Sequence, residues 1–228
     1  MTDAHAACAA TREPPRQARA LRTRQKLIDA GIEAFGRFGV DGTNLADDIL
    51  RPAGVSVGSF YHQFADKTEL LLAVLEAGVD ARRGLIVEAG IALDNPSLEA
   101  MIASGFRRLF ESLDAERHAW RIQVREHNNP DPRIHALVLA GRQRWVSLIA
   151  DALRPWSDAD EQALESAATL LMTLATGTAN VYLGMPDDHR RQSRAALLES
   201  HTQFAVAGLR PIMGASRHTA VPGASELS

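Results

Sequence analysis

The stretch GVSVGSFYHQF, residues 54–64, has the composition of a short helix with one unusual face. Ser56 is a favourable N-cap, and Phe64 together with either Val57 or Phe60 is expected to face inward. The outward positions are small residues: Ser56, Gly58 and Ser59. Because bulky side chains there would keep a partner away, we expect close approach to the helix backbone from outside. Such an approach would also explain Gly58, which costs a helix about 1 kcal/mol relative to alanine.

A second short helix is predicted directly before this stretch. Thr43 is its expected N-cap, and Leu45 and Ile49 lie on one face. Pro52 and Gly54 are expected to end it. Two short helices joined by a tight turn that contains glycine form the helix-turn-helix pattern, whose second helix enters the major groove of DNA.

Longer helices flank this pattern on both sides. Apolar residues recur at helical spacing over residues 21–38, and Gly39 follows as the expected C-cap. Asp66 and Glu69 form a capping box ahead of a leucine-rich run, so a long helix is expected to begin there.

The rest of the chain continues the helical pattern, and no segment shows sustained alternation with a period of two. We therefore expect an all-α fold of about nine helices. Asn95 and Pro96 are expected to cap the fifth helix. The expected units are a disordered arm (1–18), the helix-turn-helix domain (19–66), a larger helical bundle (67–210) and a disordered tail (211–228).

Charge is distributed unevenly along a chain whose net charge is only −3. Residues 12–26 contain six basic residues and one acidic residue, whereas residues 68–228 contain 16 basic and 20 acidic residues. The positive field therefore lies at the N-terminal end, beside the helix-turn-helix pattern. Within this segment, Arg22 and Arg24 are either solvated or in contact with DNA.

Two features bear on the cellular compartment. The chain has one cysteine, Cys8, which excludes an internal disulfide and favours a reducing compartment, and the N-terminus lacks the pattern of a signal peptide. The uncharged run over residues 166–185 contains threonines and an asparagine, so we expect a buried helix there and no contact with a membrane. A cytoplasmic location is expected.

The run TRQKLIDAGIEAFGRFGVDGTNLADDILRPAGVSVGSFYHQFADKTELLLAVLEAG, residues 23–78, resembles the N-terminal DNA-binding domain of the tetracycline-repressor-like (TetR) family of bacterial regulators. The match covers about a quarter of the chain. Beyond it, the predicted helices resemble the family only in number and order. The resemblance implies a homodimer with a ligand-binding and dimerisation domain in residues 67–210.

The resemblance also implies contacts to DNA. Thr43, Tyr61 and Lys67 would bind backbone phosphates, and the groove-facing positions would be Ser56, Val57, Ser59 and His62. From the residues alone, Thr43 is equally well explained as an N-cap. Tyr61 and His62 could be a solvated pair, and Lys67 an ordinary surface lysine.

Two features depart from the family's pattern. The second helix is one residue longer than the commonest spacing. Val57 stands where relatives often have a basic residue.

The larger bundle contains aromatic and sulfur-containing residues at helical spacing. They form either plain core or the lining of a cavity for a small apolar ligand. The candidates are Phe106, Phe110, Trp120, Trp145, Leu171 and Met172.

The predicted helix 157–183 is apolar on nearly all sides and must be covered on two of them, and the following helix, 187–209, carries a second apolar stripe. The resemblance implies a four-helix interface between two copies, and packing within one copy is the alternative. The interface candidates are Leu174, Thr178, Val181, Leu197, His201 and Phe204.

No spacing typical of a catalytic or metal site is present. Three histidines and two carboxylates fall between residues 118 and 135, but none forms an HxxxH or HExxH pattern. We therefore expect no enzymatic activity, no metal and no cofactor.

The function expected from these observations is that of a ligand-responsive repressor. As a homodimer it would bind an inverted-repeat operator in double-stranded DNA, and a small-molecule effector would release it. The main alternative is a DNA-binding protein without a ligand, which acts through a protein partner or architecturally. An enzyme built on a helical bundle is a third class.

Overall fold

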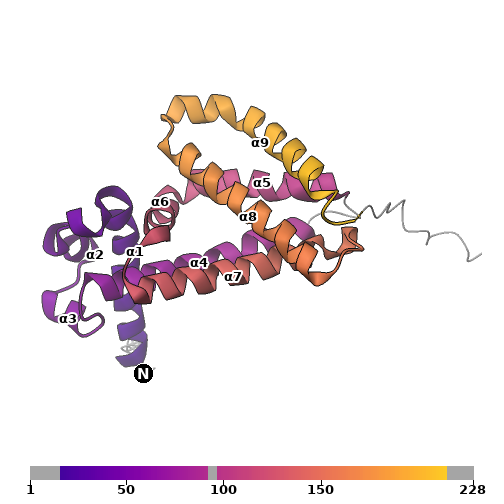
Figure 1. Cartoon of the computed structure of the whole chain (residues 1–228). Helices are drawn as coiled ribbons and strands as arrows, with labels where there is room; N and C mark the ends of the chain where they lie inside the picture. Colours follow the sequence, from indigo (N-terminus) through magenta and orange to yellow (C-terminus); the bar gives the residue numbers. More distant parts are fainter. Residues whose placement is uncertain (1–15, 92–96, 215–228) are drawn as a thin grey trace, which may run out of the picture.

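The computed structural model describes residues 16–91 and 97–214, which fold into helices and contain no strand. The all-α prediction is confirmed. Figure 1 shows a small unit at one end, built around the first three helices, and a larger bundle beside it. The α-helices of the described residues are α1 (Arg16–Gly42), α2 (Arg51–Ala53), α3 (Val57–Tyr61), α4 (Lys67–Ile91), α5 (Leu98–Ala115), α6 (Arg117–Arg125), α7 (Pro132–Leu153), α8 (Glu161–Gly184) and α9 (Asp187–Leu209).

The small unit has its own hydrophobic core. Five of its side chains are at most 1% exposed: Leu27, Phe35, Ile49, Phe60 and Phe64. Each contributes about 1.5–3 kcal/mol by leaving water. From this unit α4 runs into the bundle, where it lies beside α7 (Figure 1).

The sequence predicts Thr43 as the N-cap of the second helix, but the N-cap is Asn44. The Asn44 side chain accepts hydrogen bonds from the backbone N–H groups of Ala46 and Asp47, at 2.9 and 3.2 Å. Thr43 is only 3% exposed, and its hydroxyl donates a 2.6 Å hydrogen bond to the carbonyl oxygen of Gly39. The buried Thr43 hydroxyl therefore binds a carbonyl group in the last turns of α1.

Residues Leu45–Leu50 form a wide, π-type turn before α2. The Arg51 N–H bonds to the carbonyl oxygen of Ala46, five residues earlier. A π-turn absorbs one additional residue in a helix, which accommodates the longer spacing seen in the sequence. Pro52 lies inside this helical stretch and does not end it, whereas Gly54, at φ 63°, is the predicted C-cap.

The ends of α1 and α4 follow local sequence signals. α1 begins at Arg16, so the last three residues of the expected arm are helical. Gly39 interrupts the helix with φ 74° and ψ 170°, a conformation open mainly to glycine. Asp66 caps α4 as predicted, because its Oδ1 accepts from the Glu69 N–H at 2.8 Å; the Glu69 carboxylate accepts in return from the N–H of Ala65, the residue before the cap.

The fifth helix starts with a different cap from the one predicted. Ser97 is the N-cap of α5, and its hydroxyl accepts from the Ala100 N–H at 3.1 Å. The predicted pair, Asn95 and Pro96, lies outside the described residues.

The C-terminal end of the bundle extends past the predicted boundary at residue 210. Met213 is 1% exposed, and its carbonyl oxygen accepts a 2.8 Å hydrogen bond from the Ser157 hydroxyl. The first residues of the expected tail are therefore part of the packed bundle.

α5, α7, α8 and α9 share the second hydrophobic core. α8 contributes Ala167 and Ala168, both completely buried, and such small residues allow neighbouring helices to approach closely. The uncharged run at 166–185 lies largely in this helix. None of the helices in the described ranges is long and apolar enough to cross a lipid bilayer.

Candidate DNA-binding surface and cavity

α3 presents two chemically different faces. Phe60 and Phe64 are buried, and their ring centroids are 5.9 Å apart. Val57 and Tyr61, on the other side, are 53% and 57% exposed. The structure thus selects Phe60 over Val57 as the inward residue.

The start of α3 is held by two serines. The Ser56 hydroxyl accepts from the Ser59 N–H at 3.2 Å and lies 2.9 Å from the Ser59 hydroxyl. Ser56, Val57 and Gly58 are exposed, and Ser59 is half-buried. A Cβ placed on Gly58 would meet no atom within 4 Å, so packing inside the chain does not require glycine at this position.

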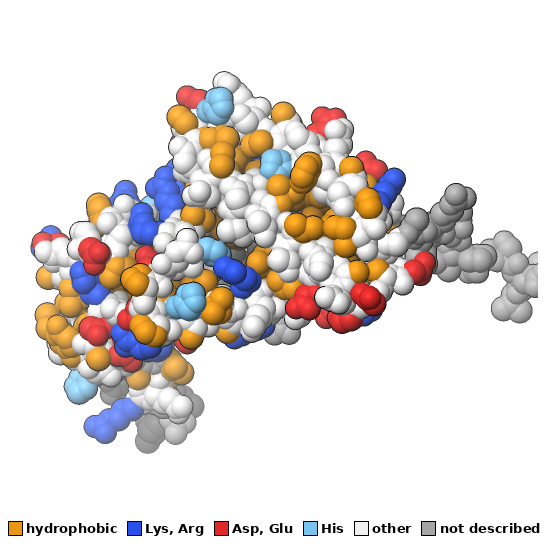
Figure 2. Space-filling view, in the orientation of Figure 1, with side chains coloured by type: hydrophobic (Ala, Val, Ile, Leu, Met, Phe, Trp, Pro, Cys, Tyr) orange, Lys and Arg blue, Asp and Glu red, His pale blue; other side chains and the backbone are white. Residues whose placement is uncertain are grey.

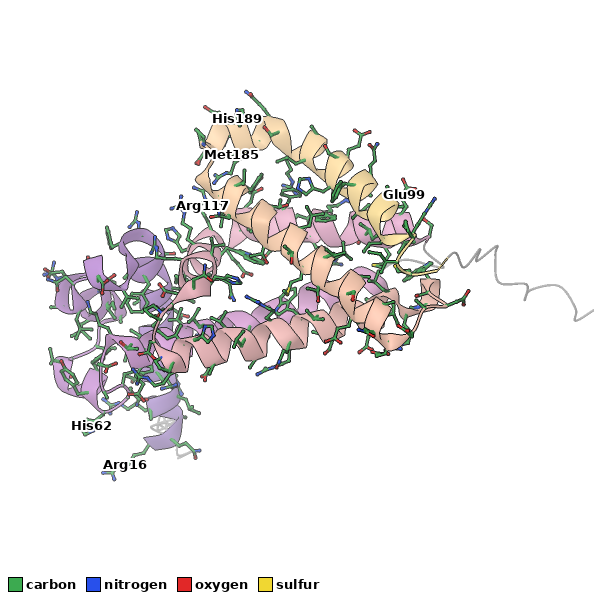
Figure 3. The ribbon with its side chains drawn as sticks, in the orientation of Figure 1. Arg16, His62, Glu99, Arg117, Met185 and His189 are labelled. Atoms are coloured by element: carbon green, nitrogen blue, oxygen red, sulfur yellow. The ribbon has the colours of Figure 1, made fainter. Side chains whose placement is uncertain are left out.

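His62, next to Tyr61, is exposed and points away from the body of the molecule. In Figure 3 it lies at the same end of the small unit as Arg16, the first described residue of α1. Arg22 is also exposed on α1. The polar outer face of α3 and the basic beginning of α1 therefore belong to the same small unit.

Arg24 has a structural role that the sequence did not reveal. Its guanidinium carbon lies 4.5 Å from the centre of the Phe64 ring, and Nη1 donates a 3.4 Å hydrogen bond to the carbonyl oxygen of Gln63. Arg24 therefore ties α1 to the residues that follow α3.

Lys67 is similarly engaged. Its ammonium group donates hydrogen bonds to the carbonyl oxygens of Val40 and Thr43, at 2.8 and 2.9 Å. A lysine has three N–H donors, so one remains for another acceptor. The buried Thr43 hydroxyl, in contrast, is turned away from solvent.

A cavity of about 190 Å³ lies in the larger bundle, between α5, α6, α7 and α8. Five of the six residues proposed from the sequence line it: Phe106, Trp120, Trp145, Leu171 and Met172. Phe110 does not. It is fully buried in the core, with its ring centroid 5.0 Å from that of Tyr182.

One part of the cavity wall is polar. Arg142 and His127 line it together with Gln123 and Thr176. Arg142 Nη2 lies 2.9 Å from His127 Nε2. Burial, and secondly the charge of Arg142, lower the pKa of His127 below its ordinary value of 6.5.

α6 lies between the cavity and the small unit. Trp120, Gln123 and Val124 line the cavity, whereas His118 packs on α1. A Cβ on Gly36 of α1 would lie only 2.5 Å from the His118 Cβ, so the two helices are in close contact there.

The predicted interface residues divide into two groups. Val181 and Phe204 are 60% and 69% exposed. Thr178 is buried, and the half-buried His201 ring lies 5.6 Å from that of Phe106, so both make contacts within the single chain. Leu174 and Leu197 pack partly against the same core.

α8 and α9 expose three large apolar side chains among small, uncharged residues. α8 presents Leu170, Thr173, Gly177 and Val181, and α9 presents Ala196, Ser200, Phe204 and Gly208. Figure 2 shows hydrophobic side chains gathered over the region of these two helices. We call this the α8–α9 surface.

A short exposed helix on a phenylalanine anchor, preceded by a tight turn and a second helix, defines a helix-turn-helix domain. Residues 27–74 match the sequence model of the family described as bacterial regulatory proteins, tetR family. Over 58 residues the chain is 48% identical to the uncharacterized HTH-type transcriptional regulator TtgW of Pseudomonas putida, an alignment that covers 25% of this chain and 42% of that protein. The helix-turn-helix domain of this chain is therefore similar to the DNA-binding domains of the tetR family.

Solved structures extend the likeness of fold beyond that domain. A transcriptional regulator from Rhodococcus sp. RHA1 has a TM-score of 0.67 at 16% identity, over 81% of this chain and 96% of that one. FadR from Bacillus subtilis, in complex with stearoyl-CoA, has a TM-score of 0.66 at 15% identity, over 81% and 98% of the two chains. The chain thus shares its two-part helical arrangement with regulators of very different sequence.

The polar part of the cavity and the α1–α6 contact were not predicted from the sequence. A signal for the polar part was present. Val138, Arg142, Trp145 and Ile149 follow each other at helical spacing on α7, and a single charge stands within that apolar row. The contact between Gly36 and His118 left no signal, because it joins residues 82 positions apart.

Proposed function

We propose that this chain is a transcriptional regulator, in particular a repressor, that binds double-stranded DNA as a homodimer and is released by a small molecule. The observation that carries the DNA-binding part is the outer face of α3. Ser56, Val57, Gly58, Tyr61 and His62 are all exposed, and two buried phenylalanines hold the helix in place. Two relatives that match this chain over 58 residues at 48% identity are named as HTH-type transcriptional regulators.

Different residues serve different parts of the proposed contact. Val57 and Ser59 face the groove and select bases, and Tyr61 binds a phosphate. Lys67 can offer its third N–H to a phosphate. We assign no phosphate contact to Thr43, because its hydroxyl donates to the Gly39 carbonyl oxygen and its N–H donates to the Val40 carbonyl oxygen. Arg24 supports α3, and Arg22 remains a candidate for direct contact.

The homodimer is proposed from the α8–α9 surface. Leu170, Val181 and Phe204 are large, exposed and apolar, and the exposed residues between them on α8 are small or uncharged. An isologous contact of this surface with itself would bury these side chains and relate the two α3 helices by a two-fold axis. Two recognition helices about 34 Å apart predict an operator with inverted-repeat half-sites.

Release by a ligand requires a connection between the cavity and the DNA-binding unit. α6 supplies a direct one, because it lines the cavity with Trp120 and packs His118 against Gly36 of α1. α4 supplies a second connection through α7. Leu70 and Val74 lie within 3.4 Å of a Cβ built on Gly31 of α1, and Val79 lies 3.3 Å from a Cβ built on Gly141 of α7, which lines the cavity. A ligand that binds better to one arrangement of these helices shifts the population toward it. FadR, a relative in fold, has been seen with stearoyl-CoA.

Footprinting on the DNA upstream of the protein's own gene tests the DNA-binding part. We expect a protected inverted repeat at low salt, with affinity that falls as salt is raised. Gly58→Glu should remove the protection, because it places a negative charge on the outer face of α3 where no neighbour within 4 Å would disturb the fold. Leu139→Glu, at an exposed site on α7, is the matched control and should leave protection intact. A wild-type protein that protects nothing at low salt would exclude a regulator of this kind.

The alternative, an architectural DNA-binding protein without a ligand, predicts the same footprint. A screen of small molecules distinguishes the two. A compound that raises the melting temperature and abolishes the footprint supports a ligand-responsive regulator. A filled cavity, produced by Ala175→Trp, should remove the response to that compound, since Ala175 lines the cavity.

A further inference from the structure

The wall of the cavity is chemically asymmetric. Most of its lining is aromatic or aliphatic, and the two titratable side chains, Arg142 and His127, lie together within 2.9 Å of each other. Of the described residues that line the cavity, none is acidic. The wall therefore offers a positive charge next to an apolar space.

Arg142 is incompletely satisfied within the described part of the chain. Its Nη2 contacts His127, but its Nε is buried and has no hydrogen-bond acceptor. No described carboxylate forms an ion pair with this guanidinium. Arg154, in contrast, pairs at the surface with Glu161. A buried N–H without an acceptor is costly, and an anionic ligand oxygen would satisfy it.

His127 does not neutralise the charge of Arg142. Its lowered pKa favours the neutral ring, whose Nε2 then accepts from Arg142, and a neutral imidazole leaves the positive charge of the guanidinium uncompensated. Glu126, the neighbouring carboxylate, is buried and accepts from the Asn129 amide instead.

We propose that the cavity takes a small amphipathic anion, a compact hydrocarbon group with one carboxylate, whose carboxylate binds the Arg142 guanidinium and whose hydrocarbon part lies against Phe106, Trp120 and Met172. This proposal rests on the proposed function in one respect, namely that the cavity is the effector site. Guanidinium and carboxylate match as planar donor and acceptor, and the surrounding low dielectric strengthens their interaction.

The size of the cavity limits the hydrocarbon group. Its volume of about 190 Å³ is somewhat larger than the roughly 150 Å³ of a buried cavity that accepts benzene. A single aromatic ring with a short linker to the carboxylate fits this space.

Three probes of similar size and different charge test the charge preference by calorimetric titration of the full chain at neutral pH. They are 3-phenylpropanoate, the neutral 3-phenylpropanamide and the cationic 3-phenylpropylamine. We expect the anion to bind at least about tenfold more tightly than the amide, as charge-assisted hydrogen bonds allow, and the amine to bind most weakly.

Variants assign the preference to Arg142. Arg142→Gln should lower the affinity for the anion about tenfold, to that of the amide, and leave the amide within about twofold. Arg142→Lys retains a charge and should keep part of the preference. Arg144→Gln, two positions further along α7 and exposed, is the matched control and should change neither affinity. Circular dichroism of each variant verifies that it is folded.

The outcomes separate this inference from the regulator function. Equal binding of anion and amide to the wild type, a preference that survives Arg142→Gln, or no binding of any probe would overturn the ligand class. None of these results touches the footprint, which is measured without ligand. Conversely, the expected order of probes with no DNA protection would support the anion site and refute the regulator.

Discussion

Arg125 of α6 donates a 2.7 Å hydrogen bond from Nη1 to the carbonyl oxygen of Phe35 in α1. Phe35 is fully buried in the core of the DNA-binding unit, and the helix that carries Arg125 also lines the cavity. This one bond therefore joins a wall of the cavity to the helix on which the recognition unit is built.

Gly36→Ala should disturb this junction. The added Cβ would lie 2.5 Å from the His118 Cβ and 2.7 Å from its Cα, so α1 and α6 must separate. We expect a loss of about 1–3 kcal/mol in the free energy of unfolding, measured by urea denaturation. Gly105→Ala is the control, because nothing lies within 4 Å of its Cβ, and it should be neutral or stabilise by up to about 1 kcal/mol. Equal stability of the two variants would contradict the close contact.

Gly58→Ala should separate stability from DNA binding. The Cβ meets no atom of the chain, so the helix propensity of alanine should stabilise the protein by up to about 1 kcal/mol. The same methyl group would hold α3 away from DNA, and we expect roughly tenfold weaker operator binding in a gel-shift titration, equivalent to about 1.4 kcal/mol. Unchanged affinity would show that the backbone at Gly58 does not approach DNA closely.

Substitutions on the outer face of α3 should have two different effects. Tyr61→Ala should weaken binding to all DNA sequences by a similar factor, since a phosphate contact has no sequence preference. Val57→Ala and Ser59→Ala should instead change the ranking of operators, by about 1–3 kcal/mol for a base that is contacted. Binding-site selection from a randomised DNA library measures both. The reverse pattern would exchange the roles of these residues.

Phe204→Asp should produce a monomer. Phe204 is 69% exposed in a single chain, and burying a charge in a self-complementary apolar interface is unfavourable. Light scattering after size-exclusion chromatography should give half the mass of the wild-type assembly, and operator affinity should fall with it. Leu139→Asp alters an exposed leucine on α7 and should remain dimeric. A dimeric Phe204→Asp variant would place the interface elsewhere.

The lowered pKa of His127 should make stability depend on pH. The unfolded chain binds a proton at this histidine near the ordinary pKa of 6.5, and the folded chain resists protonation. The free energy of unfolding should therefore decrease as the pH falls through this region, by about 1.4 kcal/mol for each unit of pKa difference at most. His127→Gln should remove this component, and Arg142→Gln should reduce it by removing one of its two causes. Parallel pH profiles for the three proteins would contradict the assignment.

The sequence by itself determined the local features, because these depend on residues a few positions apart. The Ser56 cap, the capping box of Asp66 and Glu69 and the break at Gly39 were all predictable from side-chain chemistry at fixed spacing. The inward position of Phe64 followed from helical periodicity in the same way. The exception was Thr43, since the neighbouring Asn44 offers an equally good cap and only packing decided between them.

Tertiary structure decided which side chains from distant segments meet. Arg24 and Lys67 looked like free cations in the sequence, but each binds backbone carbonyls of another segment, 39 and 24 or 27 positions away. Helical periodicity made Phe110 of α5 and Trp145 of α7 equal candidates for the cavity wall, yet only Trp145 lines the cavity. The direction in which each helix faces depends on how its neighbours cross it, and that arrangement is set by the packing of the whole core rather than by the spacing of residues along one helix.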